Sequence, residues 1–251
     1  MSLTVACAAL LVGAVFADST GFAAIGSTAA ASTSAVIAAS LSPDRLAAKS
    51  TLTFTIRYAD DEVGGVPSPV RRALLSFPAG LTLDIPQLSA CSAPRLRARG
   101  SSGCSSQSQL GGGHALVVAP LGSQTITEAI SLSIFLGVPQ NLQPTVEVLG
   151  QGLTPFDQQV LLSGATLSGR APYGEELAIS IPPIPTLPLE PDASMASISL
   201  VIGHAHASAR NANAVLIPAR CPQGGFPFAG EFTYADGSVS TATATVPCPN
   251  R

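Results

Sequence analysis

Residues 51–58 alternate between apolar and polar side chains, and this period of two constrains the fold more than any other feature of the sequence. One parity holds Leu52, Phe54, Ile56 and Tyr58, and the other holds only polar residues. Successive side chains of a β-strand point to opposite faces of a sheet, so the pattern predicts a strand with one buried and one wet face. The chain is therefore expected to build a sheet over a core.

Further segments carry strand patterns, and helix signals between them are nearly absent. They are 35–41, 72–77, 114–118, 126–136, 145–149, 159–167, 176–181, 194–202, 226–234 and 238–246. Asp236-Gly237, before the last segment, suits a tight hairpin turn. Many short strands in a chain with 23 Gly and 21 Pro predict an all-β fold. We expect an immunoglobulin-like antiparallel β-sandwich of roughly a dozen strands, or two packed sandwiches.

Glu128 interrupts the apolar side of segment 126–136, where Ile126, Ile130 and Leu132 share its parity. An unpaired carboxylate in a core is costly, because burial removes its hydration without replacing it. We therefore expect Glu128 to lie at the rim of the sheet, where the strand emerges into water.

Residues 181–191 contain five prolines and spell P-x-x-P repeatedly. Proline removes the backbone donor, so the segment is expected to be extended and unpaired. A stiff crossover between two sheets is favoured over a polyproline ligand for a partner protein.

Residues 1–17 have the character of a secretory signal peptide. An uncharged apolar run covers 3–16, and small residues precede Asp18. The run is shorter than the about 20 residues of a membrane-spanning helix. We expect cleavage near Asp18, a secreted or extracellular protein, no transmembrane segment in the mature chain, and one β-sandwich domain over 18–251. A weak division near 139–144 is the alternative.

Four cysteines remain after such cleavage: Cys91, Cys104, Cys221 and Cys248. Export would place them in an oxidising compartment, where three connectivities are possible. We favour the two local pairs, 91 with 104 and 221 with 248. Zinc binding is the alternative, although the spacings lack the close cysteine pairs of common zinc modules.

The layout of short motifs resembles that of known sequences along most of the mature chain. The motifs are Leu41-Ser42-Pro43, Phe77-Pro78-Ala79-Gly80-Leu81, the Cys91 to Cys104 segment, Ile181-Pro182-Pro183-Ile184-Pro185, and Asp236-Gly237 ahead of Cys248. In the layout of these motifs, the chain is similar to uncharacterised secreted proteins of high-GC actinobacteria, a group with no assigned activity. The resemblance implies export, a shared β fold and the disulfides, and it brings no catalytic or binding residue.

Arg95, Arg97 and Arg99 alternate inside the segment between Cys91 and Cys104. Three guanidinium groups on one edge can bind carboxylates or phosphates of an unknown cell-surface polymer or protein. A solvated loop edge is the alternative. The net charge of −3 gives no reason to expect nucleic acid as a partner.

His204 and His206 would share one side of a strand if segment 194–202 continued past Gly203. Two imidazoles in that arrangement can bind copper or zinc, and His114 is a possible third ligand that the sequence does not place nearby. Ordinary rim histidines are the alternative.

Local signatures of catalysis are missing from the sequence, including G-x-S-x-G and H-E-x-x-H. A hydrolase that uses paired carboxylates would leave no such motif. The sequence predicts a non-catalytic secreted or cell-surface binding or structural protein of unknown ligand. The alternatives are an extracellular metal-binding protein using the two histidines, and a cryptic hydrolase.

Overall fold

The computed structural model describes residues 33–60, 65–84, 89–121, 124–152, 158–186, 191–203 and 214–249. These residues all belong to one compact unit that covers 31–251. The expected signal peptide, residues 1–17, lies outside the described residues. The expected boundaries of the mature domain stay a prediction.

Thirteen strands make up the described part of the unit. They are β1 (Thr33–Ser42), β2 (Lys49–Asp60), β3 (Val70–Pro78), β4 (Thr82–Asp84), β5 (Gln109–Leu121), β6 (Gln124–Leu136), β7 (Thr145–Gln151), β8 (Gln159–Ser168), β9 (Tyr173–Ser180), β10 (Ser194–Ile202), β11 (Ala214–Leu216), β12 (Phe226–Tyr234) and β13 (Val239–Val246). Between β4 and β5 lie the helix α1 (Ala93–Arg99) and two 3-10 turns, η1 (Gly100–Gly103) and η2 (Ser106–Ser108). Every segment predicted as a strand is confirmed, whereas the three-residue strands β4 and β11 were not predicted.

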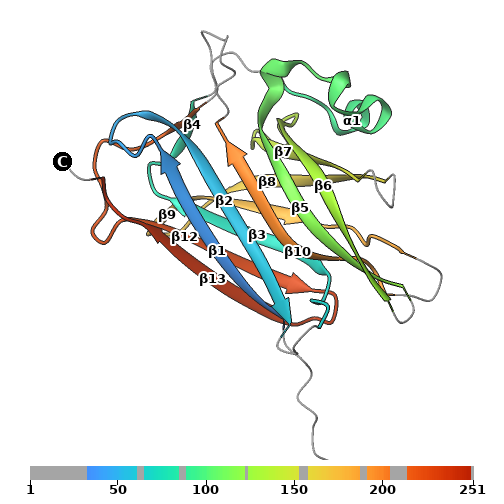
Figure 1. Ribbon diagram of the computed structural model, residues 1–251. Helices are drawn as coiled ribbons and strands as arrows, with labels where there is room; N and C mark the ends of the chain where they lie inside the picture. Colours follow the sequence, from blue (N-terminus) through green and yellow to red (C-terminus); the bar gives the residue numbers. More distant parts are fainter. Residues whose placement is uncertain are drawn as a thin grey trace, which may run out of the picture. The chain divides into compact units, whose positions relative to one another are not determined.

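The strands form a single antiparallel sheet that curls. Its order is β13-β12-β3-β9-β8-β7-β6-β5-β10-β2-β11-β4, and β1 pairs with β2. The curl brings β1 beside β13, at the opposite end of the hydrogen-bonded path (Figure 1). The all-β, antiparallel class is confirmed, and the path of pairing runs through one continuous sheet.

Aromatic side chains close the curl by joining β2 to β3 and β12. Ring centroids lie 6.1 Å apart for Phe54 and Phe228 and 5.3 Å apart for Tyr58 and Phe232. Phe77 of β3 completes the cluster, 6.3 Å from both Phe54 and Phe228. Because Phe228 and Phe232 are fully buried, apolar burial and ring contacts of ~0.5–1.5 kcal/mol per pair hold this side of the sheet together.

Gly111 and Gly113 let β5 approach β10 more closely than any side chain would permit. A Cβ atom at Gly113 would lie 2.0 Å from the carbonyl oxygen of Ser199, and one at Gly111 would lie 2.1 Å from that of Val201. Glycine is the residue that avoids such a contact. Both glycines share the inward parity of Ala115, so this stretch of the interior wall carries very little side-chain volume.

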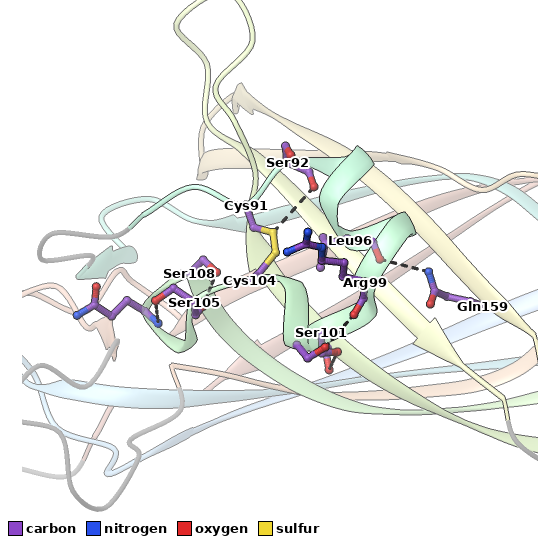
Figure 2. Close-up of a disulfide and its surroundings, with 12 residues drawn as sticks. Cys91, Ser92, Leu96, Arg99, Ser101, Cys104, Ser105, Ser108 and Gln159 are labelled. Atoms are coloured by element: carbon purple, nitrogen blue, oxygen red, sulfur yellow. Dashed lines mark hydrogen bonds between the residues drawn. A yellow bond between two sulfur atoms is a disulfide. The ribbon is translucent and has the colours of Figure 1, made fainter.

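The disulfide between Cys91 and Cys104 encloses the short helix α1, which was not predicted from the sequence (Figure 2). Pro94 stands in the first turn of the helix, and Gly100, with φ of 60°, ends it. Proline suits a first turn because its missing N–H needs no partner there, and glycine adopts positive φ without strain. Pro94 and Gly100 are therefore the start and stop signals of a short helix.

Leu96 attaches α1 to the outer face of β6, β7 and β8. Its side chain is fully buried and packs with Phe135, Leu149 and Leu161 beside the disulfide. Gln159 Nε2 donates a hydrogen bond of 3.4 Å to the carbonyl oxygen of Leu96 (Figure 2). The sheet is therefore covered by apolar contacts on part of its outer face as well as inside the curl.

The C-terminal hairpin of β12 and β13 forms as predicted. Gly237 has φ of 83° and donates its N–H to the carbonyl oxygen of Tyr234 at 3.1 Å. The aromatic residues of β12 that share one parity are all buried: Phe226, Phe228, Phe232 and Tyr234. Cys221 pairs with Cys248 across 5.8 Å between Cα atoms, so both local disulfides are confirmed.

The Tyr58 hydroxyl gives a first prediction, because it is buried without a hydrogen-bond partner among the described residues, and this burial raises its pKa. Tyr58→Phe removes an unsatisfied group, so we expect the free energy of unfolding to rise by about 1 kcal/mol in urea titrations. Tyr234→Phe is the matched control, because the Tyr234 hydroxyl lies 2.6 Å from Ser240 Oγ and its loss should lower stability by about 1 kcal/mol. Equal destabilisation by both changes would contradict this account of Tyr58.

Candidate functional site

The interior of the curled sheet is filled unequally. Aromatic rings fill the side near β2, β3 and β12, but aliphatic side chains on β6, β8 and β10 stay half-buried although they face inward. These are Ile130, Leu132, Val160, Leu162, Ile198, Leu200 and Ile202. Phe135, the one phenylalanine that the described parts of β5, β6, β7, β8 and β10 carry, packs on the outer face under α1. Short side chains thus leave space along this wall.

Cavity 1 is the first such space, with a volume of about 80 Å³. Ala115 and Val117 of β5, Ile130 of β6 and Val160 and Leu162 of β8 form its wall. Small and aliphatic groups at these positions make a surface that favours apolar contacts.

The proline-rich segment covers cavity 1. Residues 181–186 follow β9, and Ala193 precedes β10. In the order of the sheet, β8, β7, β6 and β5 lie between β9 and β10. The N–H of Ala193 donates to the carbonyl oxygen of Ile184 at 2.8 Å, and an ion pair joins Arg71 to Asp192. The described ends of this segment thus leave β9 and enter β10, which belong to one sheet, so the crossover between two sheets that the sequence favoured is not confirmed. The side chain of Ile184 lines cavity 1.

Cavity 2 lies further along the same inward faces and has a volume of about 120 Å³. On β6 it is lined by Ile134, two residues beyond Leu132 of cavity 1, and on β7 by Val148, two residues from Gly150 of cavity 1. Phe54 contributes to its wall from the aromatic side of the interior. The two cavities therefore follow one another along a single aliphatic wall.

Glu128 lines cavity 1 and does not lie at the rim of the sheet, so that expectation is wrong. Its side chain is 6% exposed, and Oε1 accepts no hydrogen bond from any residue that the structure describes. β6 begins at Gln124 and pairs with β5 from its first residue, which places Glu128 opposite Val117 within the sheet. Glu128 shares its parity with apolar residues of segment 126–136, and this indicated an inward side chain. The cost of burying a carboxylate was the reason to place it at the rim instead.

Arg95, Arg97 and Arg99 are all exposed, but they belong to a helix and not to an extended edge. Residues four apart on a helix share a face, so Arg95 and Arg99 lie on one side of α1 and Arg97 on another. Arg97 acts electrostatically on Glu147 of β7. The three guanidinium groups are brought to the same helix without forming one row, and a role for them in binding stays a prediction.

The proposed histidine pair, His204 and His206, lies outside the described residues. β10 ends at Ile202, and Gly203 follows with φ of 85°. His114 is exposed on β5, opposite Ser199 of β10. Within the described ranges, no group of three or more His, Cys, Asp or Glu side chains could hold a metal ion. Copper or zinc binding by the pair stays a prediction.

Glu147 is a second buried carboxyl, on the outer face of β7 beneath α1. Ser163 Oγ donates to Glu147 Oε2 at 2.6 Å. Burial raises the pKa of the Glu147 carboxyl above its ordinary value of 4.5, and the Ser163 hydrogen bond and the charge of Arg97 lower it in part. Unlike Glu128, this side chain has its partner within the fold.

The raised pKa of Glu147 predicts a pH dependence of stability. The folded protein holds this proton more tightly than the unfolded chain, so the stabilisation is complete below the ordinary pKa and is lost as pH rises through the folded-state pKa. Urea unfolding between about pH 4 and 8 should show wild type losing stability relative to Glu147→Gln as pH increases. The exposed Glu231→Gln is the control for loss of one charge. Parallel profiles for wild type and Glu147→Gln would refute the assignment.

Comparisons with known proteins found no matching family model, no matching curated protein and no matching solved structure. In the part of the chain that the structure describes, no helix is long and apolar enough to cross a membrane.

Proposed function

We propose that the chain is a non-catalytic binding protein that holds a small apolar molecule inside its curled sheet. The observation that carries the proposal is the half-buried aliphatic wall around cavity 1 and cavity 2. Most core side chains of a folded protein are packed at the density of organic crystals, so a half-buried aliphatic wall is an exception. A ligand that packs against this wall would restore that density.

The energetic cost of the two cavities supports this proposal. Unfilled apolar volume costs ~24 cal/mol per Å³, so 80 Å³ and 120 Å³ correspond to ~2 and ~3 kcal/mol. One phenylalanine in place of a valine would fill much of either space, and the other side of the same interior contains several. A bound apolar molecule would recover part of this cost, because it restores the missing dispersion contacts.

Cavity 1 supports a binding role better than a hydrolytic one. Glu128 is the single acidic residue on its described lining. Glycosidases place two carboxyl groups on opposite sides of the bond that they cleave, and cavity 1 offers one. Cavity 2 is lined by two acidic residues, Glu175 and Glu176, but they are neighbours on β9, where successive side chains point to opposite faces of the sheet. The proposal is therefore of a carrier or a sequestering protein, not of an enzyme.

We further propose that the protein is secreted and that the sheet is sandwich-like on its aromatic side. The two disulfides support an oxidising compartment. The rings of Phe54 and Tyr58 on β2 face those of Phe228 and Phe232 on β12, which is the packing of two facing layers. A cell-surface polymer or protein as an additional partner remains a proposal that rests on the exposed arginines of α1.

Benzene is the probe for the proposed function, since apolar cavities of about 150 Å³ bind it and cavity 2, with about 120 Å³, is the nearer of the two to that size. We expect saturating benzene to raise the melting temperature of the full-length protein by ~2–5 °C through preferential binding to the folded state. Leu200→Phe fills cavity 2, so this variant should lose the shift, whereas Val160→Phe, which fills the smaller cavity 1, should keep it.

Val36→Phe is the matched control, because Val36 is 66% exposed on the outer face of β1. It introduces a phenylalanine outside both cavities and should keep the full benzene shift. Absence of a benzene shift in wild type, or a shift that survives in Leu200→Phe, would contradict binding inside the sheet.

A further inference from the structure

The buried oxygen of Glu128 needs a partner that the described fold does not supply. Glu128 lines cavity 1, its side chain is 6% exposed, and its buried Oε1 accepts no hydrogen bond from the residues that the structure describes. A buried carboxylate without a donor loses its hydration and gains nothing in return, which makes it among the costliest groups to bury. Glu147, with nearly the same exposure, shows how the same fold satisfies a carboxyl when it has only a structural role.

The surroundings of Glu128 are otherwise apolar. Val117 stands opposite it on β5, Ile130 follows on the same face of β6, and Met195 and Ile184 approach from β10 and the proline-rich cover. Two further polar residues line the cavity: Gln158 is exposed and Thr186 is half-buried. Glu128 is thus the one buried polar side chain on the described lining, and it presents an acceptor to whatever occupies the space.

We propose that cavity 1 is a site for a small apolar amine, whose alkyl chain packs against the aliphatic wall and whose ammonium group donates to Glu128. This inference rests on the proposed function and adds the chemical class of the ligand. The volume of about 80 Å³ is close to half that of an engineered cavity of about 150 Å³ that holds benzene, so the apolar part is short, about four carbons.

An amine fits better than the other head groups of similar size. An ammonium supplies three donors and the opposite charge, and hydrogen bonds between ionised partners are about twice as strong as neutral ones. A hydroxyl offers one neutral donor, and a carboxylate would repel Glu128. A divalent metal ion requires several oxygen or nitrogen ligands, whereas the described lining provides one carboxylate.

Titration of the full-length protein with n-butylamine, 1-butanol and butanoate tests the inference. The chain contains two methionines, and Met195 lines cavity 1, so the ¹³C methyl signal of Met195 reports binding at the site. We expect n-butylamine to bind about 10- to 100-fold more tightly than 1-butanol, and butanoate to leave the signal unmoved. This comparison uses the unmodified protein and does not depend on any variant folding.

Two variants connect that preference to one side chain. Glu128→Gln should reduce the preference for n-butylamine over 1-butanol to within about threefold, because it removes the charge and keeps the shape. Glu147→Gln is the matched control: it removes a buried carboxyl from the other face of the sheet and should retain the full preference.

Melting of the protein without ligand separates a binding role of Glu128 from a structural one. Glu128→Leu replaces an unsatisfied carboxyl with a group that matches the wall, so the melting temperature should rise by at least about 2 °C. A fall in melting temperature would show that Glu128 stabilises the fold and would overturn the inference.

The experiments distinguish an error in the class of ligand from an error in the proposed function. If n-butylamine and 1-butanol move the Met195 signal with equal affinity, cavity 1 binds apolar molecules without selecting an amine, and the inference is wrong while the function stands. If neither alkyl ligand nor benzene binds, both are wrong.

Discussion

The contact between the rings of β2 and those of β3 and β12 determines where everything else in the sheet lies. Phe54 and Tyr58 reach Phe228 and Phe232 across the interior, which holds together strands that are far apart in the order of pairing. Once this side is closed, β9, β8, β7, β6, β5 and β10 must complete the curl around a space whose width the aromatic side sets. The short side chains of that second wall then decide how much of the space is filled.

The unequal filling links stability to function. Aromatic residues supply most of the large buried groups, and they are concentrated on the side that holds the sheet closed. The opposite wall combines glycine, alanine and valine on β5 with half-buried aliphatic residues on β6, β8 and β10. Proteins often accept a local loss of stability where they bind ligands. The unsatisfied carboxyl of Glu128 and the unfilled space of cavity 1 each lower stability, and they lie at the same site.

Alternation in the sequence was sufficient to predict all the longer strands, because a side-chain period of two is a local property that survives in the fold. It did not predict α1, since Pro94 and Gly100 serve equally in loops and at helix ends, and only the burial of Leu96 distinguishes the two. Nor did it predict the cavities, which depend on how strands far apart in the sequence face one another. Glu128 shows the same limit: its parity was visible, but its inward position depends on the pairing of β6 with β5 from Gln124 onward.

We propose that the interior beside β5, β6, β7, β8 and β10 is apolar space that a ligand can enter. Crystals of the protein under xenon pressure test it most directly, because xenon binds apolar cavities without needing a specific head group. We expect xenon in cavity 1 beside Val160 and Leu162 and in cavity 2 beside Ile134 and Val148. Well-ordered water chains in both places, with no xenon, would show that the interior is a hydrated space and would contradict the claim.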